Sequence, residues 1–168
     1  MIAGEGDPLP PEPPAPFQGY LAHGPREACP ACGETGPPIS RHAMWDHLEP
    51  EGIAMVHAWT RAFTCLNPSC DCLYYSLWRM VPARYCNKPL GFKSNAPSPR
   101  PICYCLGFTL EDIRRDAGRE GNGSVVRSIR EHAAQNSGLC ERLNPSGQCC
   151  WGQVRRYLDG SSGPSGRV

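Results

Sequence analysis

Cysteine is the residue type that most constrains how this 168-residue chain can fold. Eleven cysteines are present, and Cys103 and Cys105 are separated by a single residue, which is a short spacing for a strain-free disulfide. The 18 glycines and 19 prolines, set against four phenylalanines and four tryptophans, predict a thin apolar core. Small domains of this kind are usually stabilised by disulfides or by metals. Because eleven is odd, a complete disulfide framework fits poorly.

The first twenty residues lack the basic segment and the apolar segment of an export signal. No stretch approaches the roughly 20 apolar residues of a membrane span. We therefore expect a cytoplasmic protein, in which clustered cysteines indicate metal rather than disulfides. Basic and acidic residues nearly balance, at 17 and 16, so neither a nucleic-acid nor a membrane partner is expected.

Composition divides the chain into five segments and predicts the α+β class. Residues 1–25 hold seven prolines and no lysine or arginine, which is typical of a disordered tail. A small β-rich domain is expected over 26–93 and a proline-containing linker over 94–101. A short helical domain is expected over 102–159, with a flexible end over 160–168.

Side-chain alternation predicts two strands in the β-rich segment. The run 52–65, GIAMVHAWTRAFTC, alternates along its length, and 72–80, CLYYSLWRM, is rich in β-forming residues. We expect the two runs to pair as a hairpin across 66–71.

Helical spacing begins after residue 108. Thr109 and Asp112 form a capping box that predicts a helix ending at Gly118. Two more amphipathic helices are predicted over 125–133, ended by the NSG of 136–138, and over 151–158. Each is too short to be stable alone, so the three must share a core.

The first cysteine group has the spacing of a structural zinc site. Cys29 and Cys32 have two residues between them, and Cys65 and Cys70 follow with four residues between them. Four thiolates close a tetrahedron and support folding rather than catalysis. The 26–93 segment is therefore predicted to be a zinc-binding domain.

Several alternatives for this first group stay open. His42, His47 or His57 could replace one thiolate, although the step from His42 to His47 misses a single helical face. Cys72 could substitute for Cys70, but we prefer Cys70 because it closes the turn begun at Cys65. The cysteines could also be no more than small buried apolar residues.

The second cysteine group fits a 2Fe–2S cluster, which takes two thiolates on each iron. Cys103 and Cys105 can face one iron if the strand bends locally, and Cys140 with Cys149 or Cys150 can take the other. Cys150 directly precedes a predicted helix, whose free amides and dipole favour a negatively charged cluster. Gly138 and Gly147 permit a positive φ and close approach of the backbone. The cluster would then supply the core that the three helices lack.

The residues PICYCLGFTLEDI, then Cys140, then NPSGQCCWGQV resemble the 2Fe–2S domain of bacterioferritin-associated ferredoxin type. The whole arrangement over residues 26–159 resembles the N-terminal module of the CopZ copper chaperone family, which joins a zinc-binding domain to such a cluster domain. The zinc half of that family also carries C-x-x-C and C-x-N-P-x-C elements. Single motifs are weak, but their ordered combination is specific.

The resemblance implies that Cys103, Cys105, Cys140 and one of the adjacent pair hold the cluster. Relatives place the last ligand at the start of a helix, four residues before a β-branched position. Cys150 with Val154 matches that pattern and Cys149 does not. The cysteines left without a metal role are Cys72, Cys86 and Cys149.

The sequence departs from the family in one respect. The family's copper chaperones carry a C-terminal domain with a copper-binding C-x-x-C loop, whereas no cysteine follows Cys150 in this sequence. Its one C-x-x-C element, Cys29 to Cys32, is assigned to zinc. Copper delivery through such a loop is therefore not expected.

The function predicted from these motifs is that of a one-electron carrier or redox sensor holding a 2Fe–2S cluster and Zn²⁺. By resemblance it acts in copper or heavy-metal homeostasis, with a redox partner or copper-handling protein. The alternative is an all-zinc adaptor without redox activity. An enzyme is not expected, because no nucleophile–base motif is present and a four-thiolate cluster leaves no open iron. A purely structural cluster is the remaining interpretation.

Overall fold

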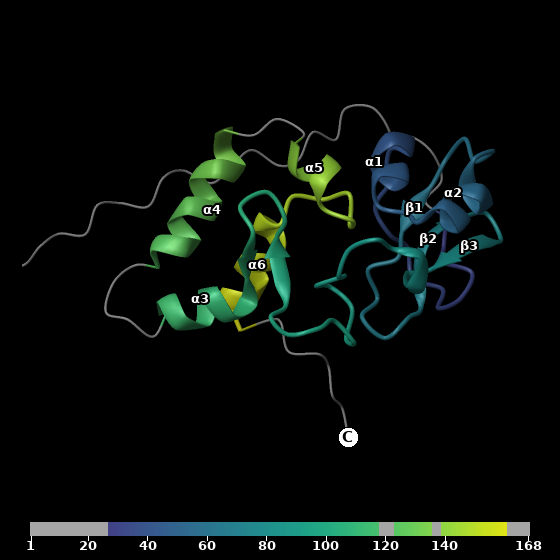
Figure 1. The fold of residues 1–168 in the computed structure, drawn as a ribbon. Coiled ribbons are helices and arrows are strands. Elements are labelled where there is room, and N and C mark those ends of the chain that lie inside the picture. The colour runs from purple at the N-terminus through teal and green to yellow at the C-terminus, as the bar shows by residue number, and fades with distance from the viewer. Residues whose placement is uncertain (1–26, 118–122, 136–138, 161–168) are drawn as a thin grey trace, which may run out of the picture.

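The computed structural model describes residues 27–117, 123–135 and 139–160. Helices and strands both occur, which confirms the α+β class (Figure 1). The predicted tail over 1–25, the helix ends at Gly118 and 136–138, and nearly all of the predicted flexible end lie outside these residues. The elements in chain order are α1 Arg41–Asp46, α2 Pro50–Val56, β1 Phe63–Thr64, β2 Cys72–Ser76, β3 Arg79–Pro82, η1 Ala83–Tyr85, β4 Pro101–Cys103, β5 Phe108–Thr109, α3 Leu110–Ala117, α4 Ser124–Gln135, α5 Leu139–Leu143 and α6 Trp151–Leu158.

The N-terminal part, residues 27–94, is built around a three-stranded antiparallel sheet in the order β1-β2-β3. Phe63 pairs with Tyr75, and Thr64 pairs with Tyr74. The predicted hairpin across 66–71 is therefore confirmed, although β1 is only two residues long. Helices α1 and α2 lie beside the sheet (Figure 1) and contribute to a core with Met44, Val56, Leu73, Tyr74 and Val81 among its members.

The prediction of one strand over 52–65 was wrong. Residues 50–56 form α2, with Pro50 at a first-turn position where its missing N–H is not needed. Gly52 and Val56 are buried four residues apart, and this helical spacing outweighs the apparent alternation. The 72–80 run also splits into β2 and β3, because the chain turns at Leu77, which has a positive φ of 52°.

The C-terminal part, residues 101–117, 123–135 and 139–160, contains the three predicted helices as α3, α4 and α6. The capping box is present: the Thr109 amide donates to Asp112 Oδ2 at 2.9 Å, and the Asp112 amide donates to Thr109 Oγ1 at 3.2 Å. The shared core of these helices contains Ile102, Ile113, Ile129 and Val154 together with Cys103 and Cys150. The sequence reading missed α1, α5 and the small β4–β5 ribbon.

Two of the side-chain contacts between the two parts reach the segment before Cys149. Tyr74 of β2 is buried and donates its hydroxyl to the Pro145 carbonyl at 2.8 Å. Asp46 at the end of α1 forms an ion pair of 3.0 Å with Arg142 of α5. Both contacts reach the segment that precedes Cys149 and Cys150, so the N-terminal part positions those cysteines.

Candidate metal centres

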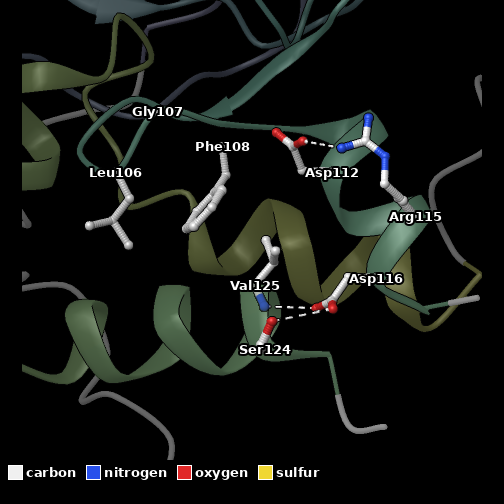
Figure 2. Close-up of a pocket in the computed structure, with 8 residues that line it drawn as sticks. All are labelled: Leu106, Gly107, Phe108, Asp112, Arg115, Asp116, Ser124 and Val125. Carbon is white, nitrogen blue, oxygen red and sulfur yellow. Dashed lines mark hydrogen bonds and ion pairs between the residues drawn. The ribbon is translucent and has the colours of Figure 1, made fainter. Parts of the chain in front are cut away.

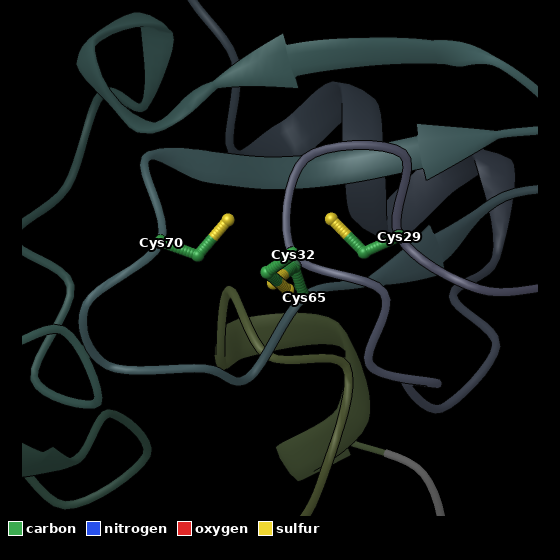
Figure 3. Close-up of side chains that lie close together, drawn as sticks. All are labelled: Cys29, Cys32, Cys65 and Cys70. Carbon is green, nitrogen blue, oxygen red and sulfur yellow. The ribbon is translucent and has the colours of Figure 1, made fainter.

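Four cysteines of the N-terminal part form the first candidate centre. The sulfur atoms of Cys29, Cys32, Cys65 and Cys70 all lie within 4.8 Å of one another (Figure 3). Cys32 Sγ and Cys65 Sγ are 3.7 Å apart. A tetrahedron with zinc–sulfur bonds of about 2.3 Å has edges of about 3.8 Å, so the donor set fits such an ion. The structure thus brings together the four residues predicted from spacing.

Tight turns present these thiols. Gly33 has a φ of +78° and donates its amide to the Cys29 carbonyl at 2.8 Å, which closes the turn between Cys29 and Cys32. On the second turn, the Ser69 amide donates to Asn67 Oδ1 at 2.9 Å, a side-chain-closed turn typical of Asn.

Burial and backbone amides shift the pKa values of these thiols in opposite directions. Burial by itself would raise the pKa of Cys29, but hydrogen bonds from the amides of Ala31 and Cys32 outweigh it and lower that pKa. Burial raises the pKa of Cys65, where the Asn67 amide and the charge of Lys93 only partly oppose it. Hydrogen bonds from backbone amides, like those that Cys29 accepts, are expected to stabilise a metal-bound thiolate.

The alternative donors lie outside this group among the described residues. Cys72 is fully buried, and its thiol contacts the Tyr74 carbonyl at 3.4 Å as well as Cys29, but it is not one of the four grouped sulfurs. His57 Nδ1 lies 2.8 Å from the Ala54 carbonyl on α2, His42 is exposed, and His47 is buried against the C-terminal part. The geometry therefore groups Cys70, and not Cys72 or a histidine, with the other three.

Five cysteines of the C-terminal part form the second candidate centre. Cys103 lies in β4, Cys105 in the turn before β5, Cys140 in α5, and Cys150 at the N-cap of α6. Cys105 Sγ and Cys140 Sγ approach to 3.3 Å. The thiol of Cys150 donates to Cys103, which lowers the pKa of Cys103 to about 7. The thiol contacts thus join Cys103 with Cys150 and Cys105 with Cys140. They do not pair Cys103 with Cys105, as the single-residue spacing had suggested.

Cys149 stands between these two pairs. Thiols of Cys140 and Cys150 both donate to it and lower its pKa to about 3, with a smaller effect from the charge of His132. Cys149 is half-buried, whereas Cys140 and Cys150 are buried. The second centre therefore holds five thiols, and a four-thiolate site would use all but one of them.

His132 belongs to this centre and the sequence reading missed it. A donor nitrogen of His132 lies within 4.8 Å of the sulfur atoms of Cys105 and Cys140. His132 follows Val125 and the buried Ile129 at steps of four and three residues, and it therefore lies on the core-facing side of α4. A polar residue on that apolar face was the available signal.

The segment from Asn144 to Gln148 fixes the approach to Cys149. Asn144 Oδ1 accepts from the Ser146 amide at 3.0 Å, and Ser146 Oγ accepts from the Gln148 amide at 3.2 Å. Gly147 has a φ of +69° and lies so close to Ile39 that an added Cβ would meet its side chain at 3.2 Å. The positive φ expected at Gly147 is confirmed, and Gly138 lies outside the described residues.

Cys86 is remote from both groups. It packs half-buried against the N-terminal core, and burial raises its pKa. This placement fits a structural thiol.

A hollow of about 430 Å³ lies between α3, the start of α4 and the turn after Cys105 (Figure 2). Asp116 on its wall accepts from the Val125 amide at 2.7 Å, and Asp112 is engaged in the capping box. Both carboxylates therefore serve the helix starts. In the described part of the chain, no helix has the length and apolar character needed to cross a bilayer.

No family model matches the chain, and no curated protein does. Among solved structures, the chain is similar to the N-terminal domain of CopZ from Archaeoglobus fulgidus, with a TM-score of 0.66 and 21% sequence identity. The match covers 79% of this chain and 98% of that domain. The chain therefore has a CopZ-like fold, and it carries cysteine groups that could bind metal.

Proposed function

We propose that this chain is a metalloprotein with zinc in the first centre and a 2Fe–2S cluster in the second, and that it carries single electrons or senses redox state. The observation that carries the proposal is the division of the cysteines into two separate groups of different geometry. The first is one compact set of four sulfurs within 4.8 Å. The second consists of two thiol contacts with a fifth cysteine between them.

Zinc suits the first centre because four thiolates leave no open position and the surrounding turns are stabilised by their own hydrogen bonds. Such a site contributes directly to folding. This supports a structural role for the first centre, with no part in electron transfer.

A binuclear cluster suits the second centre because its thiols come in pairs, as two irons require. Cys103, Cys105, Cys140 and Cys150 would hold it. Cys150 lies at the start of an eight-residue helix, where free amides favour negative charge. When bound, the cluster supplies one-electron oxidation and reduction at a potential set by charge, hydrogen bonds and exposure.

We place this activity in copper or heavy-metal homeostasis in the cytoplasm, with a redox or copper-handling protein as partner. The support is the CopZ-like fold together with the sequence resemblance to the CopZ family. A catalytic role is not proposed.

The test is metal analysis of anaerobically purified protein together with electron paramagnetic resonance of the reduced form. We expect iron and zinc in a ratio of about two to one, visible absorbance that bleaches on reduction, and the signal of a reduced 2Fe–2S cluster. Colourless, iron-free protein that stays folded with zinc at both centres would contradict the proposal.

An all-zinc adaptor is the second candidate, and one observation favours it. Cys105, His132 and Cys140 present three donors within 4.8 Å, and Cys149 contacts Cys140. Three cysteines and one histidine form a common structural zinc set. The same metal analysis distinguishes the two candidates.

A further inference from the structure

The side chain of Lys93 ends inside the loop that joins Cys65 to Cys70. Its Nζ donates to four backbone carbonyls, and Lys93 is 2% exposed. The acceptors are the oxygens of Cys65, Asn67, Cys70 and Cys72, at 3.0, 2.9, 2.9 and 2.8 Å. An ammonium group has three N–H donors, so four acceptors use all of them.

A buried charge is costly unless something compensates it. Among the described residues, no carboxylate forms an ion pair with Lys93; the ion pairs there join other residues. Its surroundings include these carbonyl dipoles, the Phe92 ring at 5.6 Å, and the Cys65 thiol, on which the charge of Lys93 acts. Thiolates of the first centre, once bound to a metal, would supply a compensating negative charge.

Ser94 extends the same arrangement. Its amide and its Oγ both donate to the Pro68 carbonyl, each at 2.9 Å. Lys93 and Ser94 together hold five carbonyls of the segment that runs from Cys65 to Cys72. Cys65 and Cys70 stand on this loop facing Cys29 and Cys32 (Figure 3), so the loop cannot open without breaking these bonds.

We infer that Lys93 is a positioning residue of the zinc centre, whose ammonium group fixes the Cys65–Cys70 loop and offsets the charge of the bound thiolates. This inference rests on the proposal that the first centre holds zinc. Lys93 contacts the backbone carbonyls of Cys65 and Cys70, so it would act through the backbone of the ligand residues. By thermodynamic linkage, the metal and the Lys93 contacts then stabilise each other.

The first test compares zinc affinity in the full chain by competition with a chromophoric chelator. Lys93→Met keeps the length of the side chain but removes charge and donors, and we expect affinity to fall by about 10–100-fold, the range seen when outer-shell partners of metal ligands are lost. Lys93→Gln keeps an amide donor, so its zinc affinity should fall less than that of Lys93→Met. Lys88→Met is the matched control, because Lys88 is the only other lysine, and it should bind like the wild type.

The second test uses the wild-type chain and so does not depend on a variant that folds. An amine-acylating reagent is applied with zinc bound and after zinc is removed, and labelling of the two lysines is read by peptide mass spectrometry. We expect Lys93 to be protected with zinc and to react at least about tenfold faster without it. Lys88 is already partly exposed and should change little. Circular dichroism recorded before and after zinc removal distinguishes loosening of this loop from general unfolding.

The outcomes separate this inference from the proposed function. A wild-type protein without zinc in the first centre defeats the proposed function. A wild-type protein with zinc, whose Lys93→Met variant binds zinc equally well, defeats the inference alone. An acylation rate of Lys93 that is the same with and without zinc would also contradict the inference, since a lysine with a purely structural role would behave in that way.

Discussion

At the scale of single residues, the role of a cysteine follows from the turn that carries it. Cys70 and Cys72 are two positions apart, yet the Cys70 sulfur joins the first centre while the Cys72 thiol is directed to the Tyr74 carbonyl. The difference arises because Cys72 already belongs to strand β2.

Cys70→Ser should therefore lower zinc affinity by more than about 100-fold, beyond the effect of an outer-shell change, since a metal ligand is lost. Cys72→Ser should retain zinc, because its sulfur is not part of the tetrahedral set. Chelator competition on both variants measures this. Equal losses in the two variants would mean that the ligand assignment is wrong.

Cys149 and Cys150 pose the same question in the second centre. Cys150→Ser should abolish the visible absorbance of the anaerobically isolated protein, because Cys150 contacts Cys103 from the start of α6. Cys149→Ser should keep most of it. Loss of the visible absorbance in the Cys149→Ser variant alone would show that Cys149, and not Cys150, is the fourth ligand.

Sequence spacing predicted the cysteines of the first centre because each tight turn places two thiols together through local geometry alone. His132 and Lys93 were not found, since their positions depend on contacts between residues far apart in the chain. Lys93 meets Cys65 from 28 positions away. No local pattern signals such a contact, whereas His132 at least interrupts an apolar helix face.

At the scale of elements, α3, α4, α6 and the hairpin across 66–71 were predictable, whereas α1, α2 and α5 were not. The capping box at Thr109 and the apolar spacing of α4 are local signals that the fold keeps. The α2 segment combines strand-like alternation with helical spacing of its buried residues, and the burial of Val56 in the core favours the helix.

The segment before Cys149 depends on Gly147. Replacement by alanine should destabilise the protein by about 1–2 kcal/mol for the positive φ and further for the contact with Ile39. Gly107→Ala is the control, with a φ of +75° and no atom within 4 Å of an added Cβ. Denaturant unfolding should show the larger loss for Gly147→Ala, and equal losses would mean that the packing against Ile39 is unimportant.

At the scale of the whole molecule, the two centres share one framework. The bond from Tyr74 to Pro145 and the ion pair of Asp46 with Arg142 connect the sheet of the N-terminal part to the segment that carries Cys149 and Cys150. Order in the first centre therefore supports the geometry of the second. A chain with few large apolar residues gains rigidity in this way without enlarging its core.

His47 lies at this junction and predicts how the whole fold responds to acid. It is fully buried, and burial lowers its pKa from the ordinary 6.5 to about 4, with only partial opposition from the backbone of Arg142 and Asn144. Between pH 4 and pH 6.5, His47 is protonated in the unfolded chain but neutral in the folded chain. The contribution of neutral His47 to the free energy of unfolding is thus fully present above pH 6.5 and is lost as the pH falls toward 4.

The loss amounts to about 3 kcal/mol over that interval, at 1.36 kcal/mol for each pKa unit. Urea unfolding of the zinc-loaded chain at pH 7, 6 and 5 should show a free energy of unfolding that declines with acidity. His47→Gln, which cannot take up the proton, should reduce the slope, whereas His42→Gln at an exposed position should leave it unchanged. An unaltered slope in His47→Gln would assign the acid sensitivity to the thiolates instead, because their protonation releases the metal.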